Sequence, residues 1–223
     1  MSPVLAIDTA GPVIGVAVHR GPPLPPQEVT VRITRGAEEI LPTLVDQACA
    51  QADVELRALV GIGVASGPGA FTGLRVGMAA AAGLAFALGV PVWTTNSLLP
   101  RAQAAGQRGR LLVMLDARKS RVYAAAWDGT ALTHPPGDVP PEEALAWVSG
   151  APFRATGEGA EVYRALVEAS GGVVHGSAER PGTAALAALA AAGLARGEGI
   201  DAVTLQAEYL RDADAVPRDA RPR

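Results

Sequence analysis

A glycine-rich segment at residues 66–77 has the residue types and spacing of a binding turn. It follows the apolar run 60–65, which is typical of a buried strand, and it leads into a long apolar run that predicts a helix. Its glycines permit positive φ angles and close backbone approach, and the first amides of a helix attract anions. The segment is not a P-loop, because Phe71-Thr72-Gly73-Leu74 stands where that motif needs a Lys-Ser/Thr pair.

Asp8 and Thr9 follow a short apolar run, and Asp116 follows a second one. In actin-like and sugar-kinase-like folds, an aspartate at such a strand end holds phosphate and a magnesium-bound water. Asp and Thr also form turns by bonding nearby backbone groups, and taken locally these residues favour that simpler interpretation. The remnant of a phosphate site that we expect comprises Asp8, Thr9, Gly67 and Gly69.

No other residue pattern indicates catalysis or a metal. The histidines His19, His134 and His175 are far apart in the sequence, and none has a partner at the spacing of helical metal ligands. Cys49 lies within a helical pattern and is expected in the core. The G-x-S-x-G motif is absent. We therefore expect no catalytic residue, no metal and no tightly held cofactor.

The composition is that of a globular protein. Of its 223 residues, 49% are hydrophobic and 18% are charged, and the net charge is -3. A polyanion such as nucleic acid would need a local basic patch or a basic partner. The single cysteine excludes an internal disulfide and fits a reducing compartment. No signal peptide is recognisable at the N-terminus, so we expect a cytoplasmic protein without a membrane partner.

The run at residues 76–93 has no charged or strongly polar side chain and approaches the length of a membrane span. It is mostly Ala and Gly and ends at Gly89-Val90-Pro91, which favours a buried helix. A helix that is apolar all round must be covered by its own domain or by another chain. The small residues spaced by four along it, which would admit another helix from either source, are Gly73, Gly77, Ala81 and Ala85.

The chain begins with a hairpin pattern at residues 4–18, a third strand at 28–34 and a helix at 38–51. Residues 111–127 repeat the order of strand, Asp-containing turn and strand, which indicates two related lobes. The pattern then thins, and we expect a loop at 134–141. Later elements are expected as helices at 142–148, 160–169 and 182–195 and a strand at 153–156.

With these residues in hand, the chain resembles the TsaB (YeaZ) family, the partner subunit of the bacterial system that makes threonylcarbamoyladenosine in tRNA. The segments that carry the resemblance are Leu5-Ala6-Ile7-Asp8-Thr9, the glycine-rich segment 66–77, Leu115-Asp116-Ala117-Arg118 with Val122-Tyr123, and Tyr209-Leu210-Arg211. They span nearly the whole chain. The glycine segment is specific, whereas the opening Ile-Asp-Thr is shared across the actin-like kinases.

The resemblance implies an α/β protein with the actin-like, sugar-kinase-like (ASKHA) fold of two ribonuclease-H-like lobes, the second one reduced. We expect the first lobe at residues 1–105 and the second at 106–202, with residues 203–223 packing back on the first. The catalytic relative TsaD holds a metal with two histidines on the helix equivalent to residues 38–51. Residues 35–39 contain no histidine here, which agrees with a metal-free, non-catalytic subunit.

The resemblance also implies partners: TsaD in a heterodimer, the ATPase TsaE, a homodimer when the chain is alone, and tRNA only through the complex. Nucleotide at a partner interface is left open. In the family, the helix after the third strand and the helix after the glycine turn form the dimer interface. The residues that we expect there are Leu41, Leu44, Val45, Ala48, Gly73, Leu74, Gly77, Met78, Ala81, Leu84 and Ala85.

Three rival functions remain beside a scaffold that binds and activates TsaD for threonylcarbamoyl transfer to the adenosine beside the anticodon. The main alternative is a small-molecule kinase or ATPase of the same superfamily that uses Asp8 and the glycine turns. It would need a full second lobe to close over nucleotide. A peptidase lacks any supporting constellation, and direct tRNA binding is disfavoured by the acidic balance.

Overall fold

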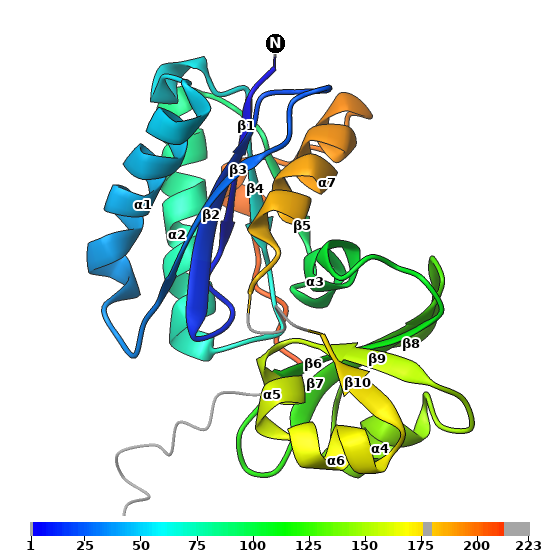
Figure 1. Ribbon diagram of the computed structural model, residues 1–223. Coiled ribbons are helices and arrows are strands. Elements are labelled where there is room, and N and C mark those ends of the chain that lie inside the picture. The colour runs from blue at the N-terminus through cyan, green and yellow to red at the C-terminus, as the bar shows by residue number, and fades with distance from the viewer. Residues whose placement is uncertain (1, 176–179, 212–223) are drawn as a thin grey trace, which may run out of the picture.

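The computed structural model describes residues 2–175 and 180–211, which form two lobes, each built on a five-stranded sheet (Figure 1). The first sheet has the order β3-β2-β1-β4-β5. Its strands are β1 (Val4–Asp8), β2 (Val13–His19), β3 (Gln27–Arg32), β4 (Gly61–Ala65) and β5 (Val92–Thr95). Strand β1 pairs antiparallel with β2 and parallel with β4, so it lies at the centre and is buried along its whole length.

The second sheet repeats this plan with the order β8-β7-β6-β9-β10. Its strands are β6 (Arg110–Asp116), β7 (Val122–Asp128), β8 (Ala131–Val139), β9 (Phe153–Thr156) and β10 (Gly172–Val174). Strand β6 is antiparallel to β7 and parallel to β9, as β1 is to its own neighbours. Asp8 and Asp116 therefore end the corresponding central strands, as the internal repeat indicated.

Helices cover both faces of the first sheet. The long helices α1 (Ala37–Ala52) and α2 (Phe71–Leu88) lie side by side on one face, and α7 (Thr183–Ala195) lies on the other (Figure 1). The carboxylate of Glu28 in β3 accepts a hydrogen bond of 3.1 Å from the amide of Ala184, in the first turn of α7. A negative charge there favours the helix N-terminus. The first lobe thus has three layers.

Shorter helices complete the second lobe. Helices α4 (Pro141–Ala146), α5 (Glu158–Val162) and α6 (Arg164–Ala169) pack around one core of its sheet. Helix α3 (Leu98–Ala104) connects the lobes and packs on the opposite face through Leu98 and Ala102. Two 3-10 helices, η1 (Leu56–Ala58) and η2 (Ala202–Thr204), lie in connecting segments of the first lobe.

Three sequence expectations differ from this fold. The expected second lobe at 106–202 includes α7, which covers the first sheet because its apolar side packs on β1, β2 and β4. The expected loop at 134–141 is mostly strand β8, where Pro135 and Pro136 are tolerated because β8 is an edge strand. The single helix expected at 160–169 is two short helices, since Tyr163 leaves helical geometry with φ -105° and ψ 26°.

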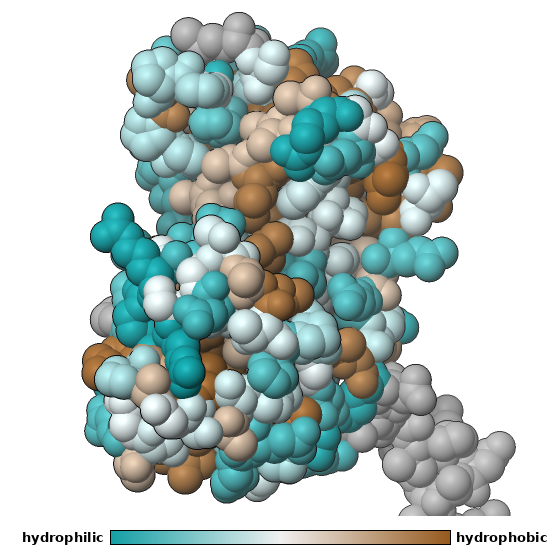
Figure 2. Space-filling model, turned by 90° about the vertical axis from the view of Figure 1, so that its right-hand side faces the viewer, coloured by the Kyte–Doolittle hydropathy of each residue, from teal (hydrophilic) through white to brown (hydrophobic). Residues whose placement is uncertain are grey.

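Helix α2 is the one helix in the described residues that is long and apolar enough to cross a membrane by length and composition. In this fold its buried side faces the sheet, and only 28% of its residues are buried. The remaining sides are apolar and partly open. Figure 2 views the opposite side of the molecule, where hydrophobic residues lie scattered among hydrophilic ones.

The C-terminal segment 200–211 returns to the first lobe and then crosses to the second. Ile200 forms an antiparallel bridge with Val92 of β5. Further along, Arg211 donates two hydrogen bonds of 2.7 Å to the carboxylate of Asp138 in β8. Leu205 and Ala207 pack against the core of the first lobe, and Arg211 binds the second lobe. Residues 212–223 of the expected segment lie outside the described residues.

Close packing of α7 predicts that Gly63 in β4 cannot carry a side chain. A Cβ atom at Gly63 would lie 2.6 Å from the Cβ of Ala190 in α7, whereas one at Gly83 on α2 would meet nothing within 4 Å. We expect Gly63→Ala to lower the free energy of unfolding by about 1–3 kcal/mol, measured by urea denaturation. The matched variant Gly83→Ala should raise it by about 0.5–1 kcal/mol. Equal effects of the two variants would contradict this packing.

Candidate functional site

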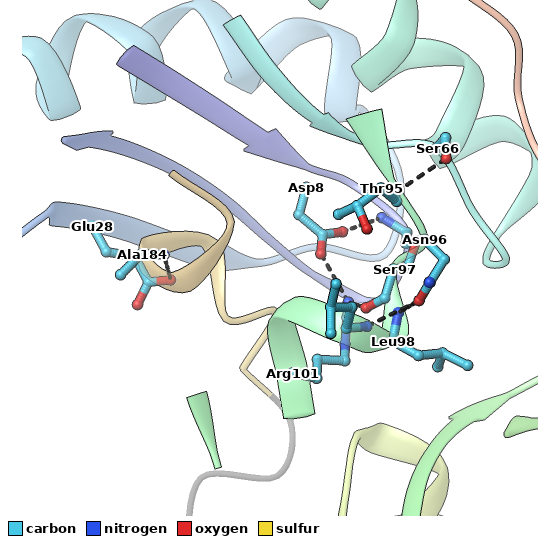
Figure 3. Close-up of polar contacts among 11 residues, drawn as sticks. Asp8, Glu28, Ser66, Thr95, Asn96, Ser97, Leu98, Arg101 and Ala184 are labelled. Atoms are coloured by element: carbon cyan, nitrogen blue, oxygen red, sulfur yellow. Dashed lines mark hydrogen bonds and ion pairs between the residues drawn. The ribbon is translucent and has the colours of Figure 1, made fainter. Parts of the chain in front are cut away.

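The turn after β1 holds Asp8 in a fully buried position with both carboxylate oxygens engaged (Figure 3). Oδ1 accepts a hydrogen bond of 2.8 Å from the amide of Ala10. Oδ2 accepts one of 2.8 Å from Nη1 of Arg101, and the two side chains form an ion pair that is 0% and 1% exposed. The negative charge of Asp8 is therefore balanced by a cation from the protein itself.

Arg101 reaches Asp8 from helix α3, which begins next to the turn. Asn96 Oδ1 accepts hydrogen bonds of 3.0 and 2.9 Å from the amides of Leu98 and Leu99, and so supports the start of this helix (Figure 3). Nη1 of Arg101 also donates to the carbonyl of Ser97 at 2.5 Å. Sequence reasoning missed Arg101. The sequence feature that could have indicated Arg101 is its position as the single charged residue in the stretch Leu98-Leu99-Pro100-Arg101-Ala102.

The hydroxyl of Thr9 is used in a contact with the first turn of α2. It donates a hydrogen bond of 2.7 Å to the carbonyl of Gly73. A Cβ atom at Gly73 would lie 2.2 Å from the carbonyl oxygen of Thr9, and one at Gly77 would lie 2.1 Å from its hydroxyl oxygen. Both glycines are therefore needed for the contact between the β1 turn and α2.

The other glycines of the segment also approach the chain itself. A Cβ atom at Gly69 would lie 2.5 Å from the carbonyl oxygen of Ala10, and the amide of Ala70 donates to that oxygen at 2.7 Å. Gly67, with φ 124°, would bring a Cβ atom within 2.2 Å of the carbonyl oxygen of Glu208. These glycines therefore serve close packing of the turn against the chain's own backbone.

Asp116 ends β6 in the second lobe and repeats part of this geometry. Its Oδ1 accepts a hydrogen bond of 2.9 Å from the amide of Arg118, two residues on, as Asp8 does from Ala10. Arg118, Lys119 and Ser120 all have positive φ angles, between 52° and 58°. Asp116 is half-buried, so it lacks the full enclosure of Asp8.

A cleft of about 1020 Å³ separates the lobes and brings the two aspartate turns together. Thr9, Gly69 and Asp116 line it, together with Glu158 at the start of α5. The pKa of Glu158 is raised to about 7, chiefly by burial and also by the charges of Asp8 and Asp116, against the attraction of Arg101 and a backbone hydrogen bond. Glu158 is a second residue that sequence reasoning missed, because a Glu beside glycines has no distinctive pattern.

Aromatic and charged residues of the C-terminal segment close the mouth of this cleft. The ring of Tyr209 lies 5.1 Å from that of Phe71, and its hydroxyl accepts a hydrogen bond of 3.2 Å from Nε of Arg75. Burial disfavours ionisation of Asp138, but hydrogen bonds from Arg211 and Arg121 outweigh it and hold the pKa of Asp138 below its ordinary value. The Tyr209-Leu210-Arg211 motif therefore ties α2 to the second lobe.

The described residues contain no group of three or more His, Cys, Asp or Glu side chains that could hold a metal ion. His134 instead stacks on Trp147, with ring centroids 4.9 Å apart. Cys49 is buried in the core of the first lobe, where desolvation and the charge of Asp46 raise the pKa of its thiol. His134 and Cys49 therefore take part in packing.

A second hollow, of about 680 Å³, is an apolar groove between α1 and α2 on the outside of the first lobe. It shares Glu38, Phe71 and Thr72 with the cleft. Its other lining residues are Leu41, Pro42, Val45, Asp46, Leu56, Arg75, Val76, Ala79, Ala80 and Leu84. Groove and cleft thus meet at the first turn of α2.

The expected interface residues lie on these two helices, and most of them are buried, although Leu41, Val45 and Leu84 also line the groove. Those that are buried in the lobe are Leu41, Leu44, Val45, Ala48, Leu74, Gly77, Met78, Ala81 and Ala85. Gly73 and Leu84 are half-buried. The ridge of small residues is used inside the lobe, since Gly73 and Gly77 admit Thr9. The outward residues of α2 are others: Thr72, Arg75, Ala79, Gly83 and Phe86.

Comparison with known proteins identifies the family to which the chain belongs. Residues 32–137 match the family model described as TsaD, tRNA N6-adenosine threonylcarbamoyltransferase. An uncharacterized protein of Mycobacterium tuberculosis is 41% identical over 163 residues, which cover 70% of this chain and 75% of the relative. The tRNA threonylcarbamoyladenosine biosynthesis protein TsaB of Haemophilus influenzae is 35% identical over 124 residues, 54% of this chain and 51% of that protein.

Among solved structures, a protein of Pseudomonas aeruginosa described as similar to peptidase YeaZ superposes with a TM-score of 0.78 at 30% identity. The match covers 95% of this chain and 100% of that one. It includes both lobes, so the resemblance seen in the sequence motifs extends to the whole fold. The chain belongs to the TsaB (YeaZ) family and has its actin-like, two-lobed α/β fold.

Proposed function

We propose that this chain is a non-catalytic subunit that binds TsaD and activates it for threonylcarbamoyl transfer to the adenosine beside the anticodon of tRNA. The observation that carries the proposal is the buried ion pair between Asp8 and Arg101. In an enzyme of this fold, the aspartate at that strand end must be free to organise a metal and its water. Here its charge is already balanced, and both oxygens have donors.

The glycine-rich segment supports the same proposal. Phosphate transfer needs donors and a metal around the transferring group. The carbonyls of Ala10 and Glu208 pack against Gly69 and Gly67 of this turn, and the amide of Ala70 is already bonded to Ala10. The turn therefore stabilises the first lobe instead of cradling a phosphate. This favours a scaffold over a kinase or ATPase, which remains the alternative because the cleft itself is roomy.

The groove between α1 and α2 is the surface that we propose for TsaD. It is apolar, and the exposed stripe of α2 beside it ends at Phe86, which is 80% exposed. Exposed apolar surface of this kind is costly in water and is typical of an interaction site. The small side chains of Ala79 and Gly83 lie on that stripe and leave room for a partner helix.

The remaining partners follow from this placement. A homodimer of the isolated chain would use the same groove, so it would compete with TsaD. TsaE and tRNA would join through the complex in the cytoplasm, since the net charge of -3 offers no general attraction for nucleic acid.

Reconstitution tests the proposed role directly. Cognate TsaD alone should form little threonylcarbamoyladenosine, and adding this chain should raise the yield severalfold, measured by nucleoside analysis of the tRNA. The chain without TsaD should neither modify tRNA nor hydrolyse ATP. Steady ATP turnover by the pure chain that disappears in Asp8→Asn would instead support the kinase or ATPase alternative.

Substituting Ala79 with Asp tests the docking surface. Ala79 is exposed on α2 and lines the groove, so a carboxylate there would be desolvated on docking without disturbing the core. We expect the affinity for TsaD to fall by about a hundredfold, which is about 2.7 kcal/mol, measured by analytical ultracentrifugation.

The matched control is Ala165→Asp, because Ala165 is exposed on α6 of the second lobe. It should bind TsaD as the wild type does, and both variants should keep the wild-type circular dichroism spectrum. Unchanged affinity of folded Ala79→Asp would rule out this face of α2.

Removing Arg101 should destabilise the first lobe, because Asp8 would be left buried without a counter-charge. Breaking a buried ion pair on one side typically costs about 3–5 kcal/mol, and we expect this loss for Arg101→Met in urea denaturation. The double variant Asp8→Asn with Arg101→Met removes the orphaned charge and should recover part of it. A loss below about 1 kcal/mol in the single variant would mean that the pair is not the anchor of this site.

A further inference from the structure

Glu158 lines the cleft from the second lobe and lies against Gly11 of the first lobe. It is 7% exposed, and its Oε1 would lie 3.1 Å from a Cβ atom at Gly11, in the turn between β1 and β2. The contact exists because residue 11 has no side chain. Whether the lobes stay closed at this point therefore depends on whether the carboxyl group of Glu158 is charged or neutral.

The surroundings of Glu158 do not compensate a negative charge. Its Oε2 has no hydrogen-bond partner among the described residues, and neither has Nε of Arg101. Arg101 attracts the carboxylate, but its guanidinium is already paired with Asp8, and Asp8 and Asp116 both repel Glu158. The backbone N–H of Glu158 itself donates to the carboxylate and lowers its pKa, but this does not offset the burial, so the charged form remains disfavoured.

Other charged groups on the packed elements are engaged elsewhere. Arg154 of β9 donates to the carbonyls of Ala105, Gly106 and Arg108 in the connection between the lobes. Arg164 of α6 pairs with Glu161 and Glu168. Tyr163, which ends α5, has a raised pKa owing to burial and the charges of Asp116 and Glu142, so it brings no positive charge.

Helix α5 cannot expose the carboxylate of Glu158 to water by moving within its own lobe. A Cβ atom at Gly157, with φ 94°, would lie 2.1 Å from the carbonyl oxygen of Met114 in β6. One at Gly159 would lie 2.9 Å from the carbonyl carbon of Leu115. The backbone on both sides of Glu158 is thus pressed against β6, so full hydration of the buried Oε2 requires the cleft between the lobes to widen.

We propose that Glu158 is a protonation-controlled latch between the lobes: its neutral acid keeps them closed on Gly11, and its carboxylate favours an open cleft. The open state hydrates the charge and moves it away from Asp8. Glu38, Phe71 and Thr72 line both the cleft and the α1–α2 groove. Opening of the cleft would therefore also change the shape of the groove beside α2. The latch itself does not depend on what binds that groove.

The direction of the pH dependence follows from linkage. In the closed state the pKa of Glu158 is raised from its ordinary value of 4.5 to about 7, chiefly by burial. The closed state therefore binds this proton more tightly than the open state does, so closure is favoured at low pH and weakens as pH rises towards 7. Between pH 5 and pH 8 the ratio of closed to open molecules should fall by on the order of a hundredfold.

Distance measurement by pulsed electron spin resonance tests the latch. Spin labels are placed at Arg35→Cys and Val162→Cys, two exposed positions that line the cleft from opposite lobes, in a Cys49→Ala background. We expect a short distance at pH 5 and a longer or broader distribution at pH 8. In the Glu158→Gln variant the short distance should persist at both pH values.

The matched control is Glu161→Gln, because Glu161 lies in the same helix and lines the same cleft but pairs with Arg164. It should respond to pH as the wild type does. Identical distance distributions at pH 5 and pH 8 in the wild type, or an undiminished response in Glu158→Gln, would overturn the proposal. If Glu158→Gln does not fold, carbon-13 NMR of the wild-type carboxyl decides, since titration near 4.5 would exclude the latch and titration near 7 would support it.

Discussion

The turn after β1 and the glycine-rich segment before α2 touch through their backbones, and the arrangement of the first lobe depends on that contact. Thr9 binds the carbonyl of Gly73, and Ala10 accepts from the amide of Ala70. A side chain at Gly69, Gly73 or Gly77 would clash with Ala10 or Thr9 and prevent these contacts. The two segments close on each other, with Arg101 supplying the positive charge beside Asp8.

These internal contacts of α2 leave an apolar outer surface on the first lobe. The small residues of helix α2 pack against the β1 turn and the sheet. The outer stripe of the helix is apolar and partly exposed to solvent. The groove beside α1 continues that stripe. The C-terminal segment holds the lobes together through Tyr209 against Phe71 and Arg211 against Asp138. The apolar groove and the tied lobes together fit the proposed role of a subunit that binds a partner.

The sequence predicted the elements whose signals are local. Alternation and apolar runs located β1, β2 and β4, and the repeated strand-Asp-strand pattern indicated the second sheet. Strand β8 was missed because Pro135 and Pro136 indicate a loop, and only its edge position in the sheet makes a strand permissible. The short elements β5, α3 and β10 have too few residues for a periodic signal. At the site, Asp8 and Thr9 were found, but Arg101 and Glu158 reach it from distant segments, and the inward direction of the α2 ridge is decided by Thr9.

Hydrogen exchange measured by mass spectrometry, on the chain alone and with cognate TsaD, tests the central claim most directly. The account predicts that partner binding slows exchange in α1 and in the outward-facing part of α2, while the turn at Asp8 is already protected in the chain alone. Slowing confined to the interlobe cleft and the second lobe, or exposure of the Asp8 turn before the partner is added, would contradict a subunit that acts through the α1–α2 surface.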